Sequence, residues 1–191
     1  MKKVLIIGAT GSLAKYVVEA VKPLENIELT LFTRNKNRLS KDLSDDCEVI
    51  EGNALNFIDI KNAVKGKDIV YINLDGDLET MTNNIVLAMQ EEKVKRIIGI
   101  SSIGIYNIPL RPVLVPYRKL ADIIENSGLN YTILRPDWFT NTDEINYETT
   151  IKGSPEIGSA ISRKSIADFV SKLINYPNLY INENLGISKP N

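Results

Sequence analysis

The sequence predicts an α/β fold with one parallel sheet and helices on both of its faces. Short apolar runs typical of buried strands alternate with longer segments in which apolar residues recur at helical spacing. Chains with this alternation form parallel sheets whose strands are joined by right-handed crossovers. The first run, Val4–Ile7, is unbroken and apolar, which indicates a strand that is buried on both faces.

The remaining strands follow at regular intervals. We expect them over 27–33, 48–51, 68–73, 95–101, 130–135, 147–151 and 179–187. In the 27–33 segment, Leu29, Leu31 and Thr33 alternate with Glu28, Thr30 and Phe32. We therefore expect this strand to be less buried than the first. The segment 137–158 shows no clear period apart from the short strand near its centre.

Helices fill the intervals between these strands. The first carries apolar residues from Leu13 to Val21 and is stopped by Pro23. Asn56 and Asp77 are expected to cap two further helices, since their side chains can accept bonds from free N–H groups. Pro116 suits the first turn of a helix that runs to about residue 126, and a final helix begins near residue 162.

Length and composition limit the function. The chain has 191 residues, a net charge of −1, one cysteine and no histidine. We therefore expect a single domain with no nucleic-acid partner and no membrane partner, in the reducing cytoplasm. Without histidine, Ser-His-Asp chemistry and imidazole-dependent zinc sites are excluded, and we expect no metal site.

The turn after the first strand predicts a dinucleotide site. Its spacing is Gly8-x-x-Gly11-x-x-Ala14, one residue longer in its first half than the commoner fingerprint. The start of a helix offers free N–H groups to a pyrophosphate, and the side chains of Thr10 and Ser12 add hydroxyl donors. A plain strand–turn–helix corner is the alternative, whereas a Walker-type loop is excluded because no Gly-Lys-Ser/Thr follows.

Ligands of open parallel sheets bind past the carboxyl ends of the strands, where the strand order reverses. The segments that follow the expected strands should therefore meet there. They are Gly8–Leu13, Thr33–Arg34, Gly52–Ala54, Asn73–Asp75, Ser101–Ser102 and Arg135–Pro136.

Several of these motifs together resemble a known family. They are Gly-Ala-Thr-Gly at 8–11, Ile-Ser-Ser at 100–102, Tyr-Arg-Lys at 117–119, Ser-Gly-Leu-Asn-Tyr-Thr-Ile-Leu-Arg-Pro at 127–136 and Ile-Ser-Arg-Lys-Ser-Ile-Ala-Asp at 161–168. The chain resembles the atypical short-chain dehydrogenases/reductases, in particular the small NAD(P)H-binding proteins related to NmrA-like proteins and to biliverdin reductase B, also called flavin reductase. The resemblance implies one Rossmann-like, doubly wound domain over 1–191, with a minimal substrate-site segment near 137–160.

The resemblance also implies cofactor positions. The expected cofactor-binding residues are Gly8, Thr10, Gly11, Ser12, Leu13, Arg34, Asn53, Ala54, Asn73, Leu74 and Ser101. The glycine turn would hold the pyrophosphate, residues 53 and 54 would face the adenine, and residues 73 and 74 would lie near the nicotinamide. An NAD-preferring site would carry an acid at the end of the second strand, whereas a guanidinium there fits a 2′-phosphate. We therefore expect NADP(H) rather than NAD(H), with a solvated strand-end charge as the alternative reading of Arg34.

The chain departs from this family in its catalytic residues. The wider family uses a Tyr with a Lys four residues on, but Tyr117 is followed at that spacing by Ala121, and Lys119 lies on another side of the helix. We expect Ser102 and Tyr117 to be the candidate catalytic residues, each with a structural role as the alternative. Trp138 and Phe139 are either a pocket wall or ordinary core.

Two functions remain. The first is an NADPH-dependent oxidoreductase that reduces a small conjugated acceptor such as a flavin or quinone, for which solvent can supply the proton. The second is a non-catalytic NAD(P)-binding redox sensor of the NmrA-like type. A sugar-nucleotide epimerase is disfavoured by the missing dyad and the short chain. The protein is expected to be a monomer or a small homo-oligomer.

Overall fold

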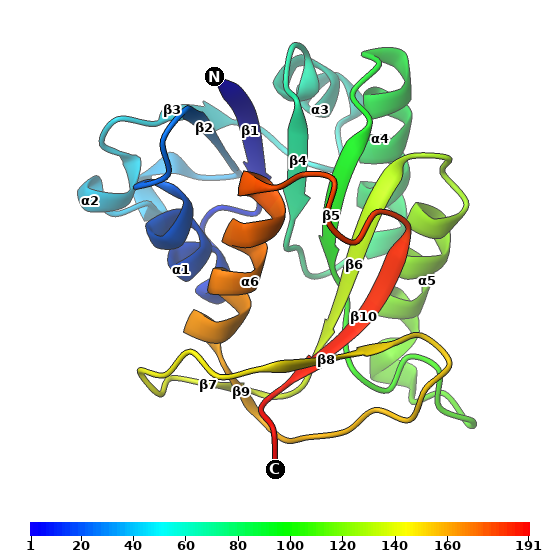
Figure 1. Ribbon diagram of the computed structural model, residues 1–191. Coiled ribbons are helices and arrows are strands. Elements are labelled where there is room, and N and C mark those ends of the chain that lie inside the picture. Colours follow the sequence, from blue (N-terminus) through cyan, green and yellow to red (C-terminus); the bar gives the residue numbers. More distant parts are fainter.

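An eight-stranded sheet forms the centre of the molecule. The computed structural model describes residues 1–191 (Figure 1). The strands of the sheet are β1 (Lys2–Ile7), β2 (Ile27–Thr33), β3 (Glu48–Glu51), β4 (Ile69–Ile72), β5 (Arg96–Ile100), β6 (Asn130–Pro136), β8 (Glu148–Ile151) and β10 (Glu183–Ser188). Their order is β3-β2-β1-β4-β5-β6-β10-β8, and β8 alone pairs antiparallel with its neighbour. The strand order reverses between β1 and β4, as expected of a doubly wound sheet.

Helices cover both faces of the sheet. Helices α1 (Ser12–Val21) and α6 (Arg163–Asn175) pack together on one face, and α3 (Phe57–Val64), α4 (Leu78–Glu91) and α5 (Val115–Glu125) pack on the other. The short α2 (Lys41–Ser44) and the 3₁₀ turns η1 (Lys36–Arg38) and η2 (Pro112–Leu114) lie in the connections. The two buried clusters contain 24 and 23 residues, so each face supports a core of similar size. The predicted Rossmann-like architecture is confirmed.

The first strand belongs to both cores. Val4 and Ile6 pack with α1 and α6, whereas Leu5 and Ile7 pack with the helices of the other face. All four side chains are fully buried. This alternation explains why the strand is a continuous apolar run: each successive side chain enters a different helix layer.

The second strand corrects a prediction. Residues 29–33 of β2 are all buried, so the expectation that this strand is less buried than the first was wrong. Strand β2 lies inside the sheet between β1 and β3, and Leu29 and Leu31 pack in the core on the α1 side. Phe32 packs in the core on the α3 side, and the hydroxyl of buried Thr30 bonds with Glu48 and Lys67.

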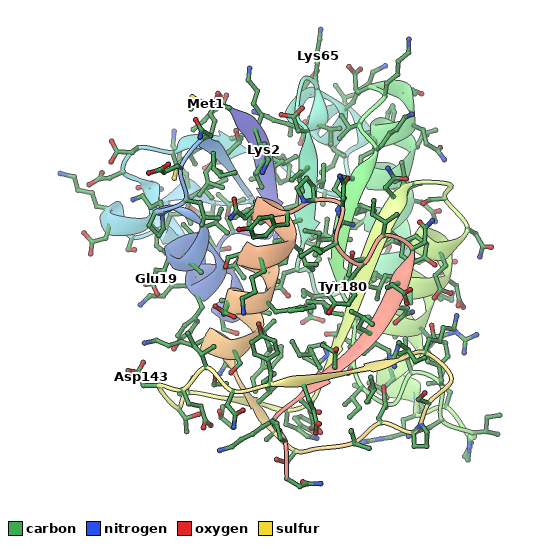
Figure 2. The ribbon with its side chains drawn as sticks, viewed as in Figure 1. Met1, Lys2, Glu19, Lys65, Asp143 and Tyr180 are labelled. Carbon is green, nitrogen blue, oxygen red and sulfur yellow. The ribbon has the colours of Figure 1, made fainter.

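The chain after β6 differs most from the elements that the sequence predicts. The last strand begins only at residue 183, because the residues from Tyr176 onward form turns rather than the expected strand start. Two-residue strands β7 (Phe139–Thr140) and β9 (Ile161–Ser162) pair with each other and were not predicted. Strands β7 and β9 lie beyond the carboxyl ends of the parallel strands, toward the lower edge of Figure 1, and Asp143, between β7 and β8, is labelled in Figure 2.

The expected helix caps are present. Asn56 Oδ1 accepts bonds from the N–H groups of Ile58 (2.9 Å) and Asp59 (3.4 Å), and Asp77 accepts from Thr80 N–H at 3.1 Å. Ser162 caps α6 through Ser165 N–H. None of the helices is both long and apolar enough to cross a lipid bilayer.

We predict that Asn56→Ala lowers the free energy of unfolding by about 1 kcal/mol, because two N–H groups at the start of α3 lose their acceptor. Urea denaturation measures the change. Asn62→Ala is the matched control, since Asn62 is an exposed position within the same helix. It should leave stability unchanged or raise it by about 0.5 kcal/mol through helix propensity. An equal loss in both variants would contradict the capping role.

Candidate functional site

A large cleft opens where the strand order reverses. It has a volume of about 1570 Å³ and lies past the carboxyl ends of β1, β2, β4, β5 and β6. Pockets for a single small ligand usually measure about 300–1000 Å³. The cleft therefore has room for a cofactor and a second molecule together. Of the residues predicted from sequence, it is lined by Gly8, Thr10, Gly11, Ser12, Arg34, Ala54, Asn73, Leu74, Ser101, Ser102 and Tyr117.

The glycine turn is fixed by a close contact with β4. Gly8 has φ +88°, and a Cβ placed there would lie 2.2 Å from the Asn73 carbonyl oxygen. Gly11 differs, because its φ of −69° is open to any residue and its N–H donates to the Gly8 carbonyl at 2.9 Å. Gly8 is thus required by the fold, whereas the missing side chain of Gly11 leaves the cleft side of the turn open.

The start of α1 has backbone donors that no group of the protein accepts. Its cap residue, Gly11, has no side chain to accept a bond, and the first turn contains no acid. The N–H groups of Ser12, Leu13 and Ala14 donate no hydrogen bond within the protein. The Leu13 side chain is buried in the core and does not line the cleft, so only its N–H is available there. These N–H groups and the helix dipole fit the pyrophosphate of a dinucleotide.

Two arginines line the next part of the cleft. Arg34 follows β2, Arg38 ends η1, and both side chains are exposed. Neither guanidinium group lies within 4 Å of a carboxylate oxygen, so neither arginine forms an ion pair. Sequence reasoning missed Arg38, whose only signal is its position four residues after Arg34. Two unpaired guanidinium groups fit the phosphate of an adenosine 2′-phosphate.

Of the two residues expected to face the adenine, only one lines the cleft. Ala54 is buried and lines the cleft. Asn53 does not line it, because its side-chain oxygen accepts the N–H of Leu55 at 3.1 Å within its own turn. The carboxamide is therefore engaged locally rather than directed at a ligand.

The serines after β5 have different surroundings. Ser101 is buried, and its hydroxyl donates to the carbonyl of Tyr117 at 2.9 Å, which ties the start of α5 to the sheet. Ser102 is half-buried, and its hydroxyl donates to the Ile103 carbonyl at 3.2 Å. That bond is local, so the Ser102 hydroxyl can turn to a ligand at small cost.

Tyr117 has a carboxylate as its partner instead of a lysine. Its phenol donates to Asp75 Oδ1 at 3.4 Å. Burial raises the pKa of Tyr117 above its ordinary value, and the negative charge and hydrogen bond of Asp75 raise the pKa further. Lys119 pairs with Glu79 on α4, and Ala121 is fully buried in the core. The phenol is consequently kept neutral, the opposite of what a Tyr–Lys dyad achieves.

Part of the remaining wall is apolar and exposed. Trp138 and Phe139 both line the cleft, with 74% and 36% of their surface exposed, so they are not core residues. The Arg163 guanidinium lies 5.0 Å from the centre of the Phe139 ring. The wall also contains Val113, whose side chain is exposed. Exposed rings and aliphatic groups of this kind suit a flat conjugated molecule.

Comparison with known proteins places the chain in a family. The sequence profile described as NAD(P)H-binding matches residues 8–177. A Rossmann-fold NAD(P)-binding family protein from Shigella flexneri is 42% identical, with a TM-score of 0.91 over 100% of this chain and 94% of that one.

More distant structures share the fold. A short-chain dehydrogenase/reductase from Veillonella parvula, in complex with NADP, is 23% identical with a TM-score of 0.90 over 99% of this chain and 95% of that one. ChuY, an anaerobillin reductase from Escherichia coli O157:H7, is 16% identical with a TM-score of 0.83 over 100% and 98%. With its free helix start at the glycine turn and a profile match over most of its length, the chain belongs to the NAD(P)H-binding family.

Proposed function

We propose that the protein is an NADPH-dependent reductase of a small conjugated acceptor such as a flavin or a quinone. The observation that carries this proposal is the joint lining of one cleft by a free helix start, two unpaired arginines and an exposed aromatic wall. The first two features suit NADPH, and the third suits a flat acceptor beside it.

The relatives support both halves of the proposal. The protein from Veillonella parvula was crystallised with NADP, and ChuY is a reductase. The segment near 137–160 supplies the wall residues Asp137, Trp138 and Phe139, together with 153–156. We assign this segment to the acceptor side of the site.

In this mechanism the protein binds and orients its ligands. The N–H groups at the start of α1 hold the pyrophosphate, and Arg34 with Arg38 holds the 2′-phosphate. Bound NADPH supplies a hydride to the acceptor. Ser102 orients the reacting groups through its hydroxyl, and the aromatic wall at Trp138 excludes water from one side of the acceptor.

No side chain is set up as a strong acid. Tyr117 is a neutral phenol whose pKa is raised by burial and by Asp75, so it gives up its proton reluctantly. A conjugated acceptor spreads the incoming charge and takes its proton from solvent, whereas a simple ketone needs protonation at an alkoxide-like oxygen. This favours flavins and quinones over ketones.

The missing dyad also favours a second candidate, a nucleotide sensor without turnover. The buried Ala121 stands where the lysine of the wider family would be. Assays of NADPH oxidation with a panel of flavins, quinones and aldehydes separate the two functions. Tight NADPH binding with no turnover on any acceptor would favour the sensor.

We predict that Arg34→Ala lowers NADPH affinity at least about tenfold and leaves NADH affinity unchanged, because a charge-assisted contact to the 2′-phosphate contributes roughly 1.5–3 kcal/mol. Arg38→Ala should act in the same direction. Calorimetric titration with both cofactors measures the ratio, and Arg111→Ala, which removes another arginine of the cleft, should not change it. An Arg34→Ala variant that keeps the full preference for NADPH would disprove the assignment.

We predict that Gly11→Val abolishes NADPH binding and leaves the fold intact. The φ of Gly11 is open to any residue, and a Cβ there would lie 3.2 Å from the Gly8 carbonyl oxygen, a contact that a small shift relieves. The added methyl groups would fill the space in which the pyrophosphate approaches the helix start. Calorimetry measures binding, and circular dichroism checks the fold. Gly8→Ala is the contrasting variant, because strain and the clash with Asn73 should destabilise the whole protein. Normal NADPH binding by Gly11→Val would show that the cofactor site lies elsewhere.

We predict that Tyr117→Phe lowers the rate of flavin reduction only about two- to fivefold, well short of the effect of losing a true general acid, about 10²–10⁴-fold. Ser102→Ala should cost more, because it removes an orienting hydroxyl. Steady-state assays with a flavin and a ketone test both variants. A ketone reduced faster than the flavin, with a loss of about a thousandfold in Tyr117→Phe, would refute this mechanism.

A further inference from the structure

A buried arginine lies at the acceptor side of the cleft and is held by a side chain from an irregular segment. Arg135, at the end of β6, has 1% of its side chain exposed and yet lines the cleft. Its Nε donates to Glu156 Oε1 at 2.9 Å. The second oxygen of that carboxylate accepts the N–H of Gly104 at 3.0 Å. One carboxylate thus occupies a site built from a guanidinium and a backbone N–H.

The rest of this site does not depend on Glu156. Arg135 Nη1 donates to the carbonyl oxygen and the side-chain oxygen of Asn184, at 2.9 and 2.6 Å. The guanidinium carbon lies 5.3 Å from the centre of the Tyr106 ring. Nη2 lies against β10, 3.5 Å from where a Cβ of Gly186 would be. The guanidinium is therefore fixed in place by contacts that do not involve Glu156.

Glu156 itself is weakly held by its own segment. Neither Pro155 nor Glu156 forms a backbone hydrogen bond, and no helix or strand includes them. Gly153 and Gly158, with φ of +93° and +88°, bound this stretch. The Glu156 side chain makes the bonds of this stretch to Arg135 and Gly104, whereas the Ile157 carbonyl accepts from Ser188 on β10; the Glu156 side chain is 21% exposed.

We propose that Arg135 and the Gly104 N–H form a carboxylate-binding subsite for the acceptor, and that Glu156 fills it until the acceptor carboxylate displaces it. A carboxylate from the ligand would accept the same two bonds, from Arg135 Nε and from the Gly104 N–H. The inference rests on the proposed reductase function for its acceptor, and it narrows the substrate class to conjugated molecules that carry a carboxylate. Trp138 and Phe139 in the same cleft suit the apolar part of such a molecule.

The test uses the full chain and two probes that no reductase of this kind would consume. Sodium benzoate carries the carboxylate, and benzamide is its neutral match in shape. Binding is followed by the fluorescence of Trp138, the single tryptophan of the chain, which lines the cleft. In Glu156→Gln, benzoate should bind about tenfold more tightly than in the parent protein, since its competitor has lost its charge. Benzamide affinity should not change.

Glu148→Gln is the matched control. It makes the same chemical change at a carboxylate of β8 that does not line the cleft and forms no bond to Arg135. Benzoate affinity in this variant should stay within about twofold of the parent, because the effect of a charge outside the cleft is screened by solvent. No gain in Glu156→Gln, an equal gain in Glu148→Gln, or an equal gain for benzamide would each overturn the subsite.

The outcome is independent of turnover. A gain in benzoate affinity without reduction of any acceptor would refute the reductase proposal and support the subsite. Reduction of flavins and quinones without any gain in benzoate affinity would support the reductase and overturn the subsite.

Discussion

The site depends on the contact between the glycine turn and the end of β4. The Asn73 carbonyl oxygen lies where a Cβ of residue 8 would be, so only glycine permits β1 and β4 to end side by side with this turn between them. The N–H groups of Gly8 and Ala9 bond to the Phe32 carbonyl and tie the same turn to β2. Fixed between its two neighbouring strands, the turn directs the first N–H groups of α1 into the cleft.

The absence of competing charges is what makes this cleft a binding site. An acid in the first turn of α1 or a carboxylate beside Arg34 would satisfy these groups within the protein, and neither is present. The opposite holds at Arg135, whose guanidinium is paired with Glu156 at 2.9 Å. The helix start and Arg34 thus keep their donors free for an anion, whereas Arg135 is already paired with a carboxylate of the protein itself. In the reductase that we propose, the cofactor would bind to a ready site and the acceptor would displace a side chain.

Much of the fold could be read from sequence because its signals are local. A few neighbouring residues are enough to recognise the apolar run of β1, the caps at Asn56 and Asp77, and the glycine turn. The burial of β2 could not be read, since it depends on which strands lie beside it. The two-residue strands β7 and β9 have no period at all and exist only because they pair with each other.

The residues of the candidate site also fall into those that a local sequence pattern marks and those that only the folded chain brings together. Gly11 and Arg34 follow strand ends, and both line the cleft as the sequence predicts. Glu156 reaches Arg135 from 21 positions further along the chain, past β7 and β8, and no sequence pattern marks it. Asn53 follows β3, as the sequence predicts, but its side chain bonds within its own turn and does not face the cleft. Topology brings segments to the cleft, and side-chain contacts then decide which of them face a ligand.

In the mechanism that we propose, hydride transfer in this cleft needs no enzymic acid, and isotope effects on the rate test that property. The rate of flavin reduction would be compared for NADPH and for NADPH deuterated at the transferred hydrogen, each in H₂O and in D₂O. A rate that falls with the deuterated cofactor and is unchanged by D₂O is the predicted result, because hydride transfer would then limit a step in which no proton moves. A slowing in D₂O as large as that caused by the deuterated cofactor, or no oxidation of NADPH at all, would rule out hydride transfer without an enzymic acid.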